Sequence, residues 1–140
     1  MRVFAVICVA VLLSACAAST TPIASNAAIP VHASKWKTDS YRSSGENTGL
    51  LIIKRDTGFR GSACIPNISL DSESIAPLNV GEKLELHLDA GRYLISAAPN
   101  YNCAANLAKA YVDISMAKTT TYRLSFVENQ SDDKDEWYSL

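Results

Sequence analysis

The chain has 140 residues, 48% of them hydrophobic, with 13 basic and 14 acidic side chains. This length favours a single domain, and the hydrophobic content excludes a chain that is disordered throughout. The balanced charge argues against nucleic acid as a partner, because neutralising phosphates requires a concentrated basic surface.

The N-terminus has the features of a secretory signal. Met1 and Arg2 form a short positive region, and an unbroken run of 11 apolar residues follows at Val3–Leu13. A membrane-spanning helix needs about 20 apolar residues, so this run is too short to span and has the length of a signal sequence. The sequence predicts that residues 1–15 are a cleaved signal peptide.

The residues after the apolar run, Leu13-Ser14-Ala15-Cys16, resemble the lipobox of bacterial lipoproteins. The resemblance implies that the Cys16 thiol and the freed amine are acylated, and several acyl chains give stable membrane anchoring. The alternative is an ordinary signal peptide cleaved near Ala15 or Ala18, which would release an unanchored protein. In known lipoproteins an Asp after the cysteine favours the inner membrane. Ala17 and Ala18 stand there instead, which implies the outer membrane, with the domain facing the periplasm.

Two of the four cysteines remain after this processing. Cys8 leaves with the signal peptide and Cys16 carries lipid, so Cys64 and Cys103 form an even pair in an oxidising compartment. We expect them to form a disulfide. A zinc site would need further closely spaced ligands, and a redox pair would need a Cys-x-x-Cys motif, which the chain lacks.

Residues 16–48 are predicted to be the lipidated cysteine and a flexible tether, because the segment is rich in small and polar residues and has no sustained periodicity. Lys35-Trp36-Lys37 and Tyr41-Arg42 interrupt this composition. They indicate either a patch that docks a partner or a short segment packed on the domain.

Residues 49–140 are predicted to form a small all-β domain, an antiparallel β-sandwich of six or seven short strands. Residues in this part alternate between apolar and polar types, as in half-buried strands. The predicted strands cover 49–54, 64–70, 74–78, 83–88, 92–97, 110–116 and 119–127, with a short closing strand near Trp137.

Several segments resemble a group of small bacterial lipoprotein domains that have no established activity. The resemblance rests on Ile52–Cys64, on Leu78–Glu82 and on Leu86–Tyr93, followed by a second cysteine, and it covers about 49–127. It implies the β-sandwich, the paired cysteines and the lipid anchor.

No arrangement of residues in the sequence predicts catalysis, a cofactor or a metal. The Gly58–Cys64 loop lacks both the phosphate-loop ending and the Gly-x-Ser-x-Gly frame of a nucleophile elbow. Its Phe59 and Arg60, together with Tyr101 in a second loop, are the candidate contacts for a partner. His32 falls in the tether, and His87 falls on the polar side of a strand.

We therefore expect a lipoprotein anchored in the outer membrane through Cys16, with a non-catalytic binding or structural role and an envelope protein as partner. The alternative is a lipoprotein inhibitor or immunity protein directed against a periplasmic hydrolase or toxin. In that case the exposed loops around Phe59 and Tyr101 would insert into the enzyme.

Overall fold

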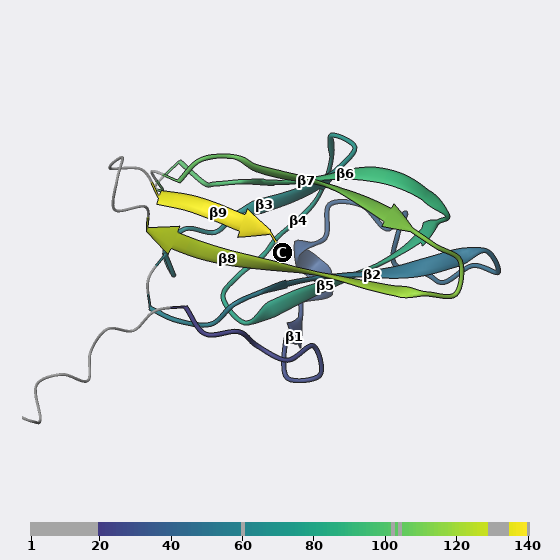
Figure 1. The fold of residues 1–140 in the computed structure, drawn as a ribbon, viewed down its shortest axis with the longest axis horizontal. Helices are drawn as coiled ribbons and strands as arrows, with labels where there is room; N and C mark the ends of the chain where they lie inside the picture. Colours follow the sequence, from purple (N-terminus) through teal and green to yellow (C-terminus); the bar gives the residue numbers. More distant parts are fainter. Residues whose placement is uncertain (1–19, 60, 102, 104, 129–134, 140) are drawn as a thin grey trace, which may run out of the picture.

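The computed structural model describes residues 20–59, 61–101, 103, 105–128 and 135–139. Nine strands in this part of the chain form two sheets, which lie face to face (Figure 1). The first sheet contains, in spatial order, β1 (Ile29–Pro30), β5 (Glu82–Asp89), β2 (Thr48–Arg55), β8 (Thr119–Glu128) and β9 (Asp135–Ser139). The second contains β4 (Glu73–Pro77), β3 (Asn67–Leu70), β6 (Gly91–Ala98) and β7 (Ala108–Ile114). The predicted fold class, a small all-β sandwich, is confirmed.

The pairing differs from the prediction in two respects. The described part has more strands than the six or seven expected: the closing strand predicted near Trp137 is β9, and two-residue β1, which was not expected, adds to the first sheet. Two pairs, β1 with β5 and β2 with β8, are parallel, whereas the others are antiparallel. Parallel pairing of β2 with β8 is possible because a long connection, which contains the four strands of the second sheet as well as β5, separates them in sequence.

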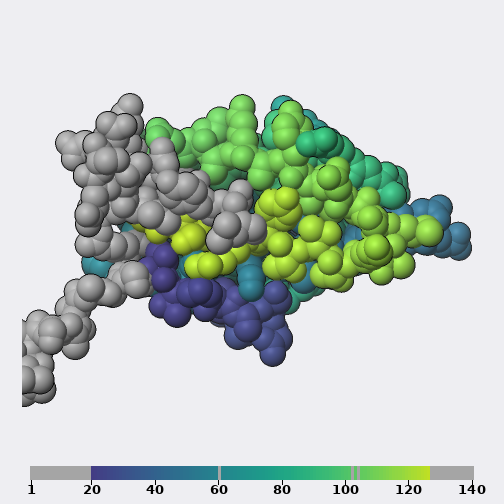
Figure 2. All heavy atoms as spheres, viewed as in Figure 1, coloured from purple at the N-terminus to yellow at the C-terminus, as the bar shows by residue number. Residues whose placement is uncertain are grey.

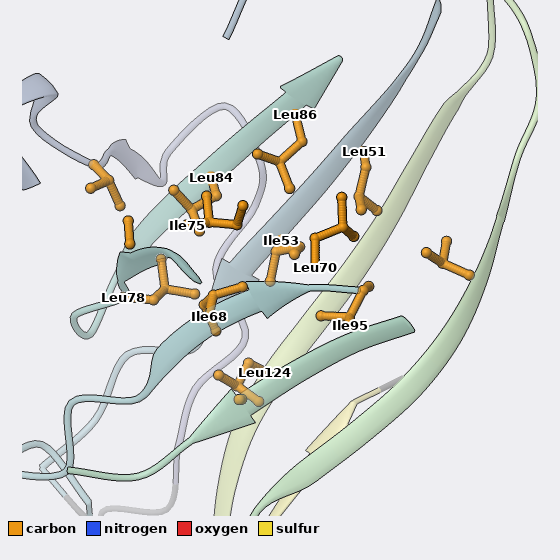
Figure 3. Packing of buried hydrophobic residues seen from close by; sticks show 14 of the residues in the cluster. Leu51, Ile53, Ile68, Leu70, Ile75, Leu78, Leu84, Leu86, Ile95 and Leu124 are labelled. Atoms are coloured by element: carbon orange, nitrogen blue, oxygen red, sulfur yellow. The ribbon is translucent and has the colours of Figure 1, made fainter. Parts of the chain in front are cut away.

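Alternating side chains build the core between the sheets. In β5, Leu84, Leu86 and Leu88 are buried, and the polar residues between them face outward. Leucine and isoleucine side chains from both sheets point toward one another in Figure 3. The labelled members are Leu51, Ile53, Ile68, Leu70, Ile75, Leu78, Leu84, Leu86, Ile95 and Leu124.

Two predicted strand boundaries are wrong for identifiable reasons. The strand expected from Cys64 begins only at Asn67, because Pro66 has no N–H to donate to a sheet. The alternation expected to continue to Met116 stops at Ile114, and Met116 lies in the turn before β8 with about half of its surface exposed.

Residues 20–48 pack on the sandwich, so the prediction of a flexible tether is wrong for them. Val31 is buried in the core, and Trp36 and Tyr41 pack against it. β1 pairs with β5, and a 3-10 turn, η1 (Ala33–Lys35), follows. Figure 2 shows the first described residues, in purple and dark blue, lying on the lower surface of the molecule. Residues 20–48 therefore belong to the same folded domain as the residues from 49 onward.

An ion pair links Asp56, the residue after β2, to Arg123 in the neighbouring strand β8. The Asp56 carboxylate accepts three hydrogen bonds from Arg123, two from Nε at 2.8 Å and one from a terminal nitrogen at 2.6 Å. The Asp56 side chain is 1% exposed, whereas that of Arg123 is 29% exposed. These hydrogen bonds raise the pKa of Arg123, since they favour its charged form.

Different loops and turns form the two ends of the sandwich. The end that we call the disulfide end is made by the loops 57–66, 78–81 and 99–107. The opposite end, called the distal end, is made by the turns 71–72 and 115–118 and by the segment 42–47 before β2. At the distal end, Gly49 approaches the turn closely, because a Cβ there would lie 2.3 Å from the Ser115 carbonyl oxygen.

Candidate functional site

The disulfide end is held together by the predicted bond between Cys64 and Cys103, which the structure contains with the two Cα atoms 5.1 Å apart. Asn100 reinforces the link between the two loops. Its side-chain oxygen accepts a hydrogen bond from the Ile65 N–H at 3.3 Å, and its amide donates to the Ala63 carbonyl at 3.4 Å. The loop that begins after β2 and the loop that precedes β7 thus form one connected surface.

A buried arginine, Arg55, holds the loop after β2 through hydrogen bonds to backbone carbonyls. The Arg55 guanidinium donates to the Leu78 carbonyl at 3.0 Å and to the Gly61 carbonyl at 2.6 Å. Burial lowers the pKa of Arg55 to about 10, so the group remains charged at neutral pH. Gly61 is required where it stands, because it has a φ of 67° and a Cβ would lie 2.3 Å from the Phe126 ring.

The structure brings two of the three predicted contact residues to the disulfide end. Phe59 is 83% exposed and Tyr101 is 96% exposed, in the two loops that the disulfide joins. The third, Arg60, lies outside the described residues, as does the predicted lipidation site Cys16. The disulfide end therefore exposes two aromatic side chains to solvent.

A second surface feature, which sequence reasoning did not assemble, is a groove between the segment 30–42 and the outer face of β5. It holds about 170 Å³ and is lined by Pro30, Val31, Trp36, Arg42, Lys83, Glu85 and His87. The Arg42 guanidinium lies over the Trp36 ring, 5.4 Å from its centroid. The Trp36 indole donates to the Val31 carbonyl at 3.3 Å. Aromatic and charged side chains side by side in a shallow groove are typical of protein contact surfaces.

Alternation along β5 supplies half of this groove. Lys83, Glu85 and His87 share one face of the strand, and Lys83 pairs with Glu85 at 2.6 Å. The alternation of the sequence predicts that these three side chains share a face. It does not predict that the segment 30–42 lies over that face, because the segment is joined to β5 through long-range hydrogen bonds such as that from the His87 N–H to the Tyr41 carbonyl at 2.8 Å.

Tyr41 makes a charge-assisted hydrogen bond beside a neighbouring hollow of about 230 Å³. Its hydroxyl donates to the Glu73 carboxylate at 2.7 Å. This bond and, to a smaller extent, burial raise the pKa of Tyr41 to about 12. The bond connects the N-terminal segment to β4 of the second sheet.

We expect this bond to make the free energy of unfolding depend on pH in the alkaline range. The folded protein holds Tyr41 in its protonated form more tightly than the unfolded chain, whose tyrosines titrate near pH 10. The stabilisation is therefore complete below about pH 10 and is lost as the pH rises toward 12. Phenolate absorbance, measured as the difference between wild type and Tyr41→Phe, should show a transition near pH 12. Glu73→Gln should move that transition to lower pH, and a transition at about pH 10 in wild type would contradict the assignment.

No group of three or more His, Cys, Asp or Glu side chains in the described part of the chain could hold a metal ion. An apolar hollow between β7 and β8 encloses about 20 Å³, space for one water molecule, so it is a packing gap. No helix within the described ranges is long and apolar enough to cross a membrane.

Comparison with known proteins leaves the chain without a family assignment: no family model, curated protein or solved structure matches it.

Proposed function

We propose that this chain is a lipoprotein of the bacterial outer membrane, anchored through Cys16, whose β-sandwich has a non-catalytic binding or structural role in the periplasm. The observation that carries the proposal is the string Leu13-Ser14-Ala15-Cys16 directly after an apolar run of signal-peptide length. A disulfide between Cys64 and Cys103 supports it, because such bonds persist in oxidising compartments outside the cytoplasm.

The partner that suits the surface is an envelope protein. The groove formed by Trp36, Arg42 and the outer face of β5 offers an aromatic ring beside side chains of both charges. Interfaces between proteins are enriched in Trp and Arg. The alternative, an inhibitor of a periplasmic hydrolase or toxin, is favoured by one observation. Phe59 and Tyr101 are exposed in loops that the disulfide joins, and loops of this kind can insert into an active site.

Lipidation at Cys16 is tested by replacing it in the full chain and following the protein in a Gram-negative host. Wild type should fractionate with the outer membrane and carry added acyl mass, whereas Cys16→Ser should lose both, because serine has no thiol to acylate. Cys8→Ser is the matched control, since Cys8 lies within the apolar run and should leave anchoring unchanged. Wild-type protein that is free in the periplasm without acyl mass would overturn the proposal.

The partner is tested by cross-linking the full-length lipoprotein in cells and identifying what the membrane fraction contains. Capture of an envelope assembly, lost in an Arg42→Glu variant, would support the binding role of the groove. Capture of one secreted hydrolase or toxin through Phe59 or Tyr101 would support the inhibitor instead.

A further inference from the structure

The path of the chain fixes which end of the sandwich lies nearest to Cys16. Thr21 and Thr57 form an isolated bridge, in which the Thr21 N–H donates to the Thr57 carbonyl at 2.7 Å and the Thr57 N–H donates back at 2.9 Å. The Thr20 hydroxyl lies 3.0 Å from the Ser125 hydroxyl in β8. Because Thr57 comes two residues after the last residue of β2, in a loop of the disulfide end, the described chain starts at that end.

Covalent geometry then limits how far that end can be from the anchor. Thr20 is the fourth residue after Cys16, and an extended chain covers at most about 3.6 Å per residue. Thr20 therefore lies within about 14 Å of the Cys16 backbone in any conformation. With residues 20–48 packed on the domain, no long tether remains to hold the sandwich away from the lipid.

The apolar side chains exposed at this end match that position. The large hydrophobic residues that are at least half exposed in the described ranges are Ile29, Phe59, Tyr101, Leu107, Tyr111 and Met116. Three of them, Phe59, Tyr101 and Leu107, stand in loops of the disulfide end. Tyr and Trp side chains are enriched at the interface between lipid and water, and Phe and Leu side chains insert at the boundary between head groups and acyl chains.

Charge does not supply the attraction. Glu128 and Asp135, the paired ends of the β8–β9 hairpin, belong to the same end, and the sequence between them contains two Asp and one Lys. Phosphate-bearing head groups would repel these carboxylates. The contact is therefore apolar and should depend little on salt.

We propose that the disulfide end lies against the membrane surface, with Phe59 inserted among the lipid head groups, so that the groove and the distal end face the periplasm. The inference rests on the proposed anchor at Cys16. It assigns Phe59 and Tyr101 to lipid and leaves the Trp36–Arg42 groove for the protein partner.

Quenching of tryptophan fluorescence by brominated lipid tests this orientation. Phe59→Trp is compared with Met116→Trp, a second exposed apolar position that lies at the distal end, about 25 Å away along the eight residues of β2. Both lipoproteins, purified with their acyl chains, are placed in vesicles of phosphatidylcholine brominated near the top of one acyl chain. The native Trp36 and Trp137 contribute equally to both proteins and to the wild-type reference.

Brominated lipid should quench most of the emission from the tryptophan introduced by Phe59→Trp, measured as the difference from wild type. It should quench almost none of the emission from the tryptophan introduced by Met116→Trp. Equal quenching of the two variants, no quenching of either, or stronger quenching of Met116→Trp would overturn the orientation. Mass spectrometry of the same samples separates this from failure of the proposed function. Absence of acyl mass on Cys16 overturns the anchor and the orientation together, whereas acyl mass without quenching at position 59 overturns the orientation alone.

Discussion

Replacement of both bridging cysteines, Cys64→Ala with Cys103→Ala, is expected to lower the free energy of unfolding by about 4 kcal/mol. The bond closes a loop with a sequence separation of 39 residues, and this figure is what restriction of the unfolded chain gives for a loop of that length. Cys64 is buried and Cys103 packs against the core, so alanine also removes some apolar contact. Urea unfolding of residues 17–140 measures the difference.

The control for this prediction is the wild-type protein with reductant. Reduction opens the same loop without changing a residue, and it should therefore account for most of the loss. The Asn100 hydrogen bonds to Ile65 and Ala63 should weaken as well, because the loops that they join are no longer tied covalently. Faster proteolytic cleavage near Tyr101 in the double variant would report this. An unfolding midpoint equal to that of wild type would mean that the bond contributes nothing.

The strands and their buried faces were predictable where side chains alternate. Leu84, Leu86 and Leu88 are all buried, and the polar residues between them line the groove, as period-two alternation requires. In β8, which falls within the strand predicted over 119–127, Leu124 and Phe126 are buried and Tyr122 packs against the core, so the same alternation holds. Local pattern was enough in these strands because each presents one face to the core over several residues.

The packing of residues 20–48 was not predictable from such a pattern. Only scattered positions of this segment reach the core, among them Val31 and Trp36, and β1 pairs through just two residues. A segment that is attached at isolated points shows neither helical nor strand periodicity. Its composition therefore resembled a linker, although β5 and the second sheet hold it in place. The sequence singled out Trp36 and Arg42 as part of a docking or packing segment, but it did not place them beside the outer face of β5 that completes the groove.

The burial of charged residues at the end of β2 was also not predictable from the sequence. Arg55 and Asp56 come directly after the strand predicted over 49–54, and both are buried. Their partners come from elsewhere: Leu78 and Gly61 for Arg55, and Arg123 for Asp56. Arg123 is 67 residues from Asp56 and reaches it only because β2 and β8 pair in parallel. Their pairing is a consequence of the topology, which local sequence does not encode.

The two partners of the Asp56–Arg123 ion pair are expected to contribute unequally to stability. Arg123→Met should lower the free energy of unfolding by about 3–5 kcal/mol, because it leaves the Asp56 carboxylate in a buried site without the guanidinium that compensates it. Asp56→Asn should cost less, about 1–3 kcal/mol, because the Arg123 side chain is partly exposed and can turn toward water. Denaturant unfolding of both variants and of the double variant gives the coupling between them.

A matched control lies on the outer face of the second sheet. Arg92 approaches Asp113 only to 3.9 Å, and both side chains are mostly exposed, so Arg92→Met should change stability by less than about 1 kcal/mol. Arg123→Lys keeps the charge but loses the paired geometry, and it should recover only part of the loss from Arg123→Met. A smaller effect for Arg123→Met than for Asp56→Asn would contradict the argument, because it would mean that the carboxylate reaches water or another donor once the arginine is removed. The asymmetry thus tests the burial of Asp56 itself, on which the junction between β2 and β8 depends.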